Sequence, residues 1–364
     1  MSESGDYYRA LVRGELRGFW PSVERGMLWA ASQPYGWMSG LRNRLYDRGW
    51  KRRYQAGVPV VSVGNLTLGG TGKTPCVEYV AGFYANLDRR VVILSRGYAR
   101  RGNANDEACL LAANLPGVPH LQGRDRIALA RQAIGMRAEV LVLDDGFQHR
   151  RLARDLDIVL IDASEPWQDE RMFPRGFLRE FREELGRAHV VVLTRTDQVD
   201  QSERGRLREV VARIAPNTVL VLARHRPLCW LKVDGSRHDL QSLAHRPVAA
   251  FCGLGHPDGF RRTLIDLGMR LCAFRSFPDH HAYTAGDMED LAAWKQQWGP
   301  ECVLVTTQKD LVKMRPGHSV GRDLWALRIA FDFQAGQDAL DRKLKEAIGE
   351  RTHPNARRHG FCAV

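Results

Sequence analysis

The sequence lacks several features that would assign it to a broad class of proteins. Its seven cysteines include no C-x-x-C pair, so their spacing indicates neither a zinc site nor a disulfide framework. Scattered cysteines of this kind are typical of a reducing compartment. Beyond a formal charge of +12 there is no signature of RNA or DNA binding, and we expect no nucleic-acid partner. The basic surface equally suits phosphate-bearing substrates and anionic lipid headgroups.

A membrane-crossing run and a cleavable signal peptide are also not expected. The stretch 26–41 carries no charge over 16 residues, which is short of the ~20 residues needed to cross a bilayer. Pro34 is expected to break it. Glu3, Asp6 and Glu15 interrupt the region before it, which argues against a signal peptide.

Aromatic and basic residues surround this charge-free stretch. Trp20, Trp29, Trp37 and Trp50 lie in or beside it, and six arginines and lysines follow within 42–53. Amphipathic rings next to cations are what a segment on an anionic membrane surface needs. The alternative is an amphipathic helical hairpin packed on the protein's own core, and both interpretations stay open here.

The most informative motif present is the stretch 58–74, VPVVSVGNLTLGGTGKT. An apolar run that fits a buried strand leads into a glycine-rich turn and then into a helix, the order found in phosphate-binding loops. Lys73 would neutralise phosphate charge, and the Thr74 hydroxyl could hold Mg²⁺. Thr67 departs from the strict pattern, which has Gly there, and a glycine-rich turn that binds nothing is the alternative. The expected nucleotide-binding residues are Thr67, Gly69, Gly70, Thr71, Gly72, Lys73 and Thr74.

Further strands predict the fold class. The run 139–145, EVLVLDD, ends in Asp144 and Asp145, the form of a Walker B segment whose carboxylate holds Mg²⁺. Buried strands separated by helical stretches indicate a P-loop NTPase-like parallel sheet with helices on both faces. In such sheets ligands gather at the carboxyl ends of the strands. The predicted metal ligands are therefore Thr74, Asp144 and Asp145.

The strand and helix pattern changes near residue 226, which predicts a second, smaller α/β domain after a short β linker. The expected domains are 1–53, an N-terminal membrane-surface helical segment; 54–225, a P-loop kinase domain; 226–245, a hairpin linker; 246–350, the smaller α/β domain; and 351–364, a basic tail.

Several segments together resemble one family, the tetraacyldisaccharide 4'-kinases of lipid A synthesis. The resemblance rests on the stretches at 58–75, 95–98 (SRGY), 105–112 (NDEACLLA), 143–162 (LDDGFQHRRLARDLDIVLID), 174–180 (PRGFLRE), 277–283 (FPDHHAY) and 304–314 (LVTTQKDLVKM). It implies transfer of the γ-phosphoryl group of ATP, with Mg²⁺, to the 4'-hydroxyl of an acylated disaccharide 1-phosphate. It also implies work at the anionic surface on the cytoplasmic face of the inner membrane. We expect a monomer.

The resemblance also implies catalytic residues. Asp106 is the candidate base, and His280, next to Asp279, would be its partner from the other α/β unit. Asp106 as a helix N-cap is the alternative, and for the pair at 279–280 it is a solvated loop or an adventitious metal site. Lys73 completes the expected catalytic set. Weaker candidates for substrate contacts are His149, Arg126, Arg179 and Glu180.

Two rival functions are compatible with parts of the pattern. Thr194-Arg195-Thr196-Asp197 distantly resembles the guanine-reading [NT]-K-x-D motif, which favours a GTP-using maturation factor of related P-loop fold. A non-catalytic membrane-surface scaffold with a decayed nucleotide site is the other. Lys73, Thr74 and Asp144 are all intact, which argues against the scaffold.

Overall fold

The computed structural model describes residues 2–97, 106–167, 171–255, 257–279, 281–314 and 324–349. Contacts divide the chain into two compact units. The first contains Met1–Gly97, Gly117–Arg224 and Phe333–Val364, and the second contains Tyr98–Pro116 and His225–Asp332. Two long strands, β7 (Val219–Lys232) and β12 (Leu324–Ala335), contribute residues to both units. The predicted domain ranges stay a prediction, and the predicted tail 351–364 lies outside the described residues.

The first unit is built on a parallel sheet with the strand order β7-β6-β5-β1-β4-β2-β3. Its strands are β1 (Val60–Asn65), β2 (Val91–Ser95), β3 (His120–Gln122), β4 (Val140–Asp144), β5 (Leu156–Asp162) and β6 (Val190–Thr194). Its helices are α1 (Ser2–Arg13), α2 (Phe19–Asp47), α3 (Lys73–Ala85), α5 (Arg126–Gly135), α6 (Gln201–Ile214) and α10 (Gln337–Gly349), with two 3-10 turns, η2 (Arg182–Arg187) and η3 (Thr196–Gln198).

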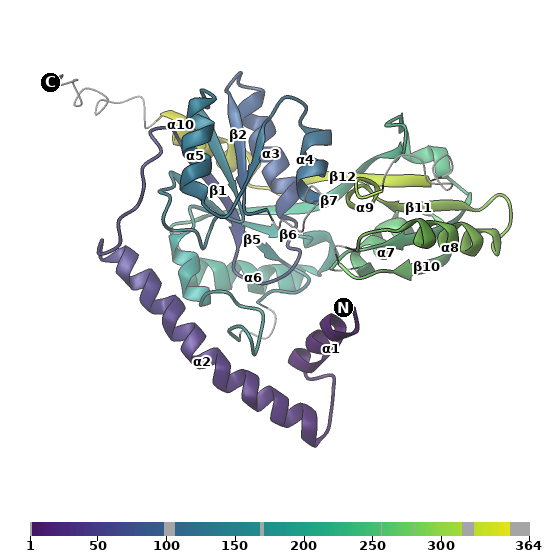
Figure 1. The fold of residues 1–364 in the computed structure, drawn as a ribbon, viewed down its shortest axis with the longest axis horizontal. Coiled ribbons are helices and arrows are strands. Elements are labelled where there is room, and N and C mark those ends of the chain that lie inside the picture. Colours follow the sequence, from purple (N-terminus) through teal and green to yellow (C-terminus); the bar gives the residue numbers. More distant parts are fainter. Residues whose placement is uncertain are drawn as a thin grey trace. The chain divides into compact units, whose positions relative to one another are not determined.

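Helices cover both faces of this sheet, as the all-apolar strands predict. On one face Leu141 and Leu143 of β4 pack with α5, and Val159 of β5 and Val191 of β6 pack with α6. Helix α3 contacts helix α10 through Tyr84, whose hydroxyl donates to the Leu344 carbonyl at 2.7 Å. The result is an α/β fold of the P-loop NTPase type (Figure 1).

The second unit has its own sheet, ordered β10-β9-β11-β12-β7, with β8 antiparallel to β7. Its other elements are α4 (Asp106–Asn114), β8 (Arg237–His238), η4 (Leu240–Leu243), β9 (Pro247–Cys252), α7 (Pro257–Asp266), β10 (Arg270–Ser276), α8 (Ala285–Gln296), β11 (Val303–Thr307) and α9 (Gln308–Leu311). Helix α4 is attached to this unit through α9, where the side-chain amides of Asn114 and Gln308 hydrogen-bond to each other at 2.7 Å.

Helix α2 differs from the expectation that Pro34 would break the N-terminal segment. It runs without interruption from Phe19 to Asp47 (Figure 1). The side chains of Ser32 and Gln33 donate to the Trp29 carbonyl, next to the carbonyl that Pro34 leaves without its usual donor. After the proline, Tyr35 donates to the Arg179 carbonyl and Gly36 lies close to the Phe181 ring, so contacts on both sides of Pro34 hold one helix. Of the helices in the described ranges, none is long and apolar enough to span a bilayer.

Candidate functional site

The glycine-rich loop connects β1 to α3 at the carboxyl end of the sheet. Gly69 and Gly72 have φ angles of 127° and 82°, a region that glycine enters without steric cost. Strand β6, which lies two strands from β1 in the sheet, supports the loop from the side. The Thr194 hydroxyl donates to the Thr71 carbonyl, and the Arg195 guanidinium donates to the Gly70 carbonyl, each at 3.0 Å. The loop is therefore held in shape by β6 and the residue that follows it.

Lys73 is the first residue of α3, and its ammonium group points to two oxygen ligands. Nζ donates to Asn65 Oδ1 at 3.2 Å and lies 3.6 Å from Asp145 Oδ1. Arg179 donates to both oxygens of Asp145 at 2.8 Å. Burial alone would raise the pKa of Asp145, but Lys73 and Arg179 lower it to about 2. The carboxylate is thus charged at neutral pH and holds both cations at the loop.

The residues near the start of α3 fit a hard divalent cation. Asp144 is the last residue of β4 and is buried. Burial of the Cys76 thiol, and secondly the negative charge of Asp144, raise the pKa of Cys76 to about 12, so Asp144 lies near the first turns of α3. Thr74 is the second residue of α3, and the hydroxyl of Ser62 is buried on β1 with no hydrogen-bond partner. All three offer oxygen atoms, which Mg²⁺ prefers. Asp145, the third predicted ligand, contacts Lys73 and Arg179, and its role as a metal ligand stays a prediction.

Arg126 and His149 extend the charged cluster on the same unit. Arg126 is buried at the start of α5 and adds to the lowering of the Asp145 pKa. Burial, followed by the charge of Arg126, lowers the pKa of His149 to about 4. His149 Nε2 is buried without a hydrogen-bond partner. The structure therefore brings His149, Arg126 and Arg179 into the neighbourhood of Lys73 and Asp145, where cations predominate.

Asp106 lies in the second unit rather than in the unit of the phosphate-binding loop. Its Oδ2 is 3.6 Å from Nζ of Lys313, which also contacts Asp310 Oδ1 at 2.9 Å. Lys313 and Asp310 are 4% and 0% exposed, so this triad is sheltered from solvent. Asp106 therefore lies in the same unit as Asp279, whereas the sequence places the base in the unit of the phosphate-binding loop. The pairing of Asp106 with His280 itself stays a prediction.

The partner expected for Asp106, His280, lies outside the described residues. Its neighbour Asp279 is described, and its Oδ1 accepts from Lys309 Nζ at 3.3 Å. Burial lowers the pKa of Lys309, but Asp279 leads the charges that raise it overall. Asp279 is thus held by a lysine of α9, the helix that also packs on α4.

Comparisons with known proteins show which family the chain resembles. The family model for tetraacyldisaccharide-1-P 4'-kinase matches residues 25–349. A tetraacyldisaccharide 4'-kinase of Anaeromyxobacter dehalogenans strain 2CP-1 is 42% identical over 342 residues, which cover 87% of this chain and 89% of that protein. The chain belongs to the tetraacyldisaccharide 4'-kinase family.

Two further relatives support the same assignment of this kinase. The 4'-kinase of Syntrophus aciditrophicus is 40% identical over 305 residues, covering 76% of this chain and 80% of that one. The solved apo-form LpxK of Aquifex aeolicus, in complex with ATP, is 31% identical with a TM-score of 0.71, covering 89% of this chain and 99% of that chain. The family and P-loop fold expected from the sequence are confirmed. The GTP-using maturation factor is not favoured.

Glu180 has a different environment from the substrate contact expected of it. It is fully buried, and protein groups hold both of its oxygens. Oε1 accepts from Arg42 at 2.6 Å and from Asn43 at 3.1 Å, and Oε2 accepts from Arg187 at 2.6 Å. Two of these partners belong to α2. In this kinase Glu180 thus connects α2 to the 3-10 turn η2, which precedes β6.

Three residues of the loop's surroundings were not identified from the sequence as site residues. Asn65 contacts Lys73, and Thr194 and Arg195 contact the loop backbone. Arg195 also forms an ion pair with Asp162, and burial lowers its pKa to about 10. The position of Thr194 and Arg195 at the end of a parallel strand was a usable signal. It was interpreted as a guanine-reading motif, whereas in the structure both residues support the loop.

Proposed function

We propose that the loop at 67–74 of this kinase binds the phosphates of ATP and that Lys73 neutralises them during transfer to the 4'-hydroxyl of an acylated disaccharide 1-phosphate. The observation that carries the proposal is the position of Lys73 at the N-terminus of α3, fixed by Asn65 and Asp145. Backbone amides at a helix N-terminus favour phosphate oxygens. The ATP complex of the Aquifex relative supports the choice of nucleotide.

The remaining residues of the cluster divide the work of positioning charge. Thr74 and Asp144 would hold Mg²⁺, which neutralises charge on the β and γ phosphates when bound. Asp145 keeps Lys73 and Arg179 facing the loop, and it is the further candidate ligand for the metal. Arg126, Arg179 and His149 supply further donors for anionic groups of either substrate.

Asp106 is the proposed base for the acceptor hydroxyl, with His280 as its partner and Asp279 beside it. Support comes from the family motif and from the triad with Lys313 and Asp310, which keeps Asp106 in place. Lys313 lies closer to Asp310, at 2.9 Å, than to Asp106, at 3.6 Å, so Asp310 balances most of the positive charge of Lys313. A proton accepted at Asp106 or passed to His280 would leave the hydroxyl free to attack.

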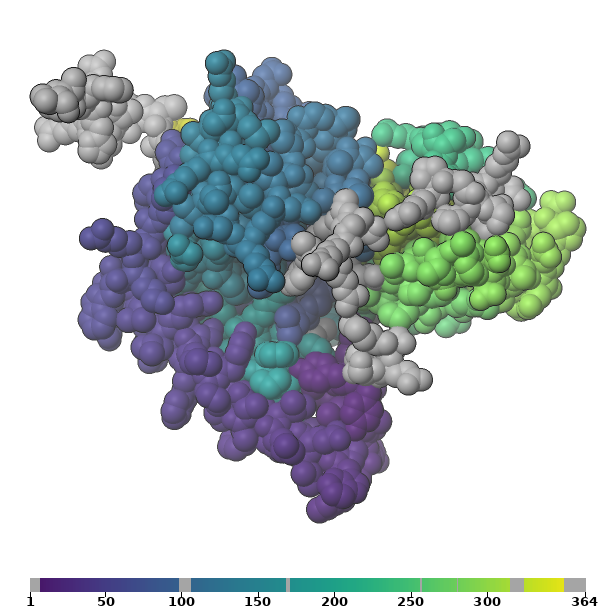
Figure 2. All heavy atoms as spheres, in the orientation of Figure 1, coloured from purple at the N-terminus to yellow at the C-terminus, as the bar shows by residue number. Residues whose placement is uncertain are grey.

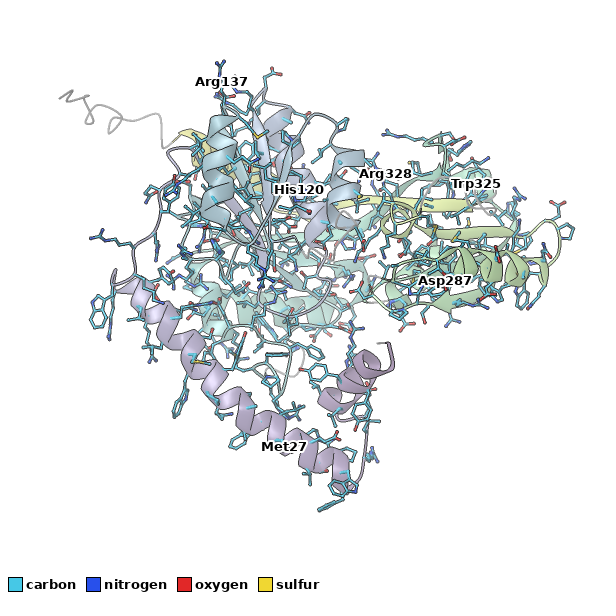
Figure 3. All side chains as sticks on the ribbon, in the orientation of Figure 1. Met27, His120, Arg137, Asp287, Trp325 and Arg328 are labelled. Carbon is cyan, nitrogen blue, oxygen red and sulfur yellow. The ribbon has the colours of Figure 1, made fainter. Side chains whose placement is uncertain are left out.

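We also propose that α2 lies on the anionic surface of the inner membrane at its cytoplasmic face. Trp20, Trp29 and Trp37 are 72%, 58% and 78% exposed. Met27, labelled on α2 in Figure 3, adds an exposed apolar side chain. In the space-filling view the atoms of α2 form a continuous purple strip (Figure 2). Exposed aromatics on one helix favour burial at the headgroup level.

Cations accompany these aromatic residues. Helix α2 and residues 171–181 enclose a groove with a volume of about 480 Å³. Arg25, Arg171 and Arg175 line it, and none of the described residues that line it is acidic. Guanidinium groups beside exposed indoles suit a phosphate headgroup. We propose that the kinase works there as a monomer.

The function is tested by one assay of the purified kinase with γ-labelled ATP or GTP and a detergent-dispersed acylated disaccharide 1-phosphate. Label is expected at the 4' position with ATP and only when the lipid is present. Turnover of GTP without lipid would contradict the proposal and favour the maturation factor.

A further inference from the structure

Residues 177–180 form a short segment that contacts α2 on one side and the phosphate-binding loop on the other. On the α2 side, the Tyr35 hydroxyl donates to the Arg179 carbonyl at 3.1 Å. Arg42 and Asn43 hold the buried carboxylate of Glu180. Three side chains of one helix therefore fix two consecutive residues of this segment.

The same segment brackets the start of the loop through its backbone. Arg179 N donates to the Leu66 carbonyl at 2.8 Å, and Leu68 N donates to the Phe177 carbonyl at 2.7 Å. These two bonds lie on either side of Thr67, which pairs with Leu178 as an antiparallel bridge. The first residues of the phosphate-binding loop thus form a small ladder with the segment that α2 holds.

A second connection runs through side chains. The Arg179 guanidinium clamps Asp145, and Asp145 lies beside Lys73. Arg179 therefore contacts α2 through its backbone carbonyl and the loop through its backbone amide. Its side chain contacts Asp145, the carboxylate beside Lys73. A displacement of residues 179–180 would be transmitted to Lys73 by both routes.

Removing any one partner of the buried Glu180 carboxylate is expected to destabilise the contact between α2 and residues 177–180. Glu180 is buried with three charged or polar partners, and removing one partner of a buried carboxylate leaves charge uncompensated. The helix also approaches closely at Gly36, where an added Cβ would lie 3.1 Å from the Phe181 ring. The segment responds to α2 because it is packed and ion-paired against it rather than loosely touching it.

We propose that Tyr35, Arg42 and Asn43 of α2 are positioning residues for nucleotide binding: through the segment 177–180 they set the geometry of Thr67 and Lys73. Helix α2 thus acts on the phosphate site as well as on the lipid surface. This inference rests on the proposed function, in that the loop must bind ATP.

The matched pair Arg42→Ala and Arg44→Ala tests the inference. Both remove one positive charge from α2, two residues apart, and the Arg44 side chain is exposed whereas that of Arg42 reaches Glu180. In detergent without lipid substrate, equilibrium ATP binding by Arg42→Ala is expected to weaken roughly tenfold, which corresponds to the loss of about one hydrogen bond to the nucleotide. Arg44→Ala is expected to bind ATP like the wild type, and Arg42→Lys to recover part of the loss.

The outcomes separate this inference from the proposed function. A wild-type kinase that binds no ATP would overturn the proposed function before any variant is compared. Equal ATP affinity of Arg42→Ala and Arg44→Ala, with the wild type binding normally, would overturn the inference alone. If Arg42→Ala melts without nucleotide at the assay temperature, Tyr35→Phe replaces it, with Tyr8→Phe as control. The Tyr8 hydroxyl donates to Pro174, outside residues 177–180, and phenylalanine keeps the ring that packs on Phe177. Equal affinities for that pair would again overturn the inference.

Discussion

Each unit of this kinase places a lysine beside aspartate, but the two surroundings differ in charge. In the first unit Lys73 and Arg179 share Asp145, and Arg126 adds a further positive charge. In the second unit Lys313 is shared by Asp310 and Asp106, so carboxylates predominate. The cation-rich cluster suits anionic phosphates, whereas the carboxylate-rich triad suits a group that accepts a proton. From this comparison we propose that one cluster binds the nucleotide and that the other accepts the proton.

The largest expected effect comes from the cation-rich cluster. Lys73→Ala and Asp144→Ala should each lower kcat by about 10³-fold or more, because both act on phosphate or metal. Circular dichroism should show that both variants are folded, and the melting temperature of Lys73→Ala should stay near wild type because Asp145 keeps Arg179. Near-normal kcat in either folded variant would refute the phosphate-binding role.

The next effect belongs to the carboxylate-rich triad. Asp106→Ala and His280→Ala should each lower kcat by about 10²- to 10⁴-fold with little change in ATP affinity, as expected for loss of a general base. The double variant should be scarcely worse than the more damaged single variant. Asp258→Ala, on α7 of the same unit, provides a control aspartate. Multiplicative losses in the double variant would show that the two residues act independently.

A smaller effect is expected at the surface of α2. Trp29→Ser and Trp37→Ser should weaken binding to anionic vesicles several-fold and raise KM for lipid more than KM for ATP. These positions are exposed, so the substitutions leave the anchor at Glu180 intact. Trp298→Ser, in the second unit and 44% exposed, is the matched control. Unchanged vesicle flotation of the α2 variants would show that α2 is only a structural helix.

The smallest expected effect concerns pH. Burial holds the pKa of His149 at about 4, below its ordinary 6.5. The unfolded state therefore takes up a proton first as the pH falls, so this group lowers stability between pH 6.5 and 4. The decrease is on the order of 2 kcal/mol once the partial exposure of the imidazole is allowed for. Urea unfolding of His149→Gln should show a shallower decrease over that window. A slope equal to the wild type would contradict a buried, neutral His149.

The first unit could be predicted from the sequence more completely than the second. The apolar strands and GGTGKT fixed the position of Lys73 at a helix start, because strand, glycine turn and helix are local patterns. Asp106 was assigned to the first unit because it follows β2 in the chain. Its true unit depends on the long-range contact between α4 and α9, for which residue spacing carries no signal.

The environment of Glu180 and the continuity of α2 were missed for a related reason. Pro34 is a helix breaker by local propensity, but tertiary packing and the side chains of Ser32 and Gln33 outweigh it. Glu180 follows an arginine in an exposed-looking PRGFLRE stretch, and only the fold places Arg42, Asn43 and Arg187 around it. Burial of a charged side chain depends on its partners, and two of the three partners of Glu180 lie 138 and 137 positions away in sequence.

The most direct test of the division between the two clusters is a comparison of ATP binding with turnover in Lys73→Ala and Asp106→Ala. Equilibrium dialysis with labelled ATP and the 4'-kinase assay would be run on the same preparations. Lys73→Ala is expected to lose both ATP affinity and turnover, and Asp106→Ala to keep wild-type affinity while losing turnover. An Asp106→Ala variant that lost ATP affinity as fully as Lys73→Ala would contradict the account.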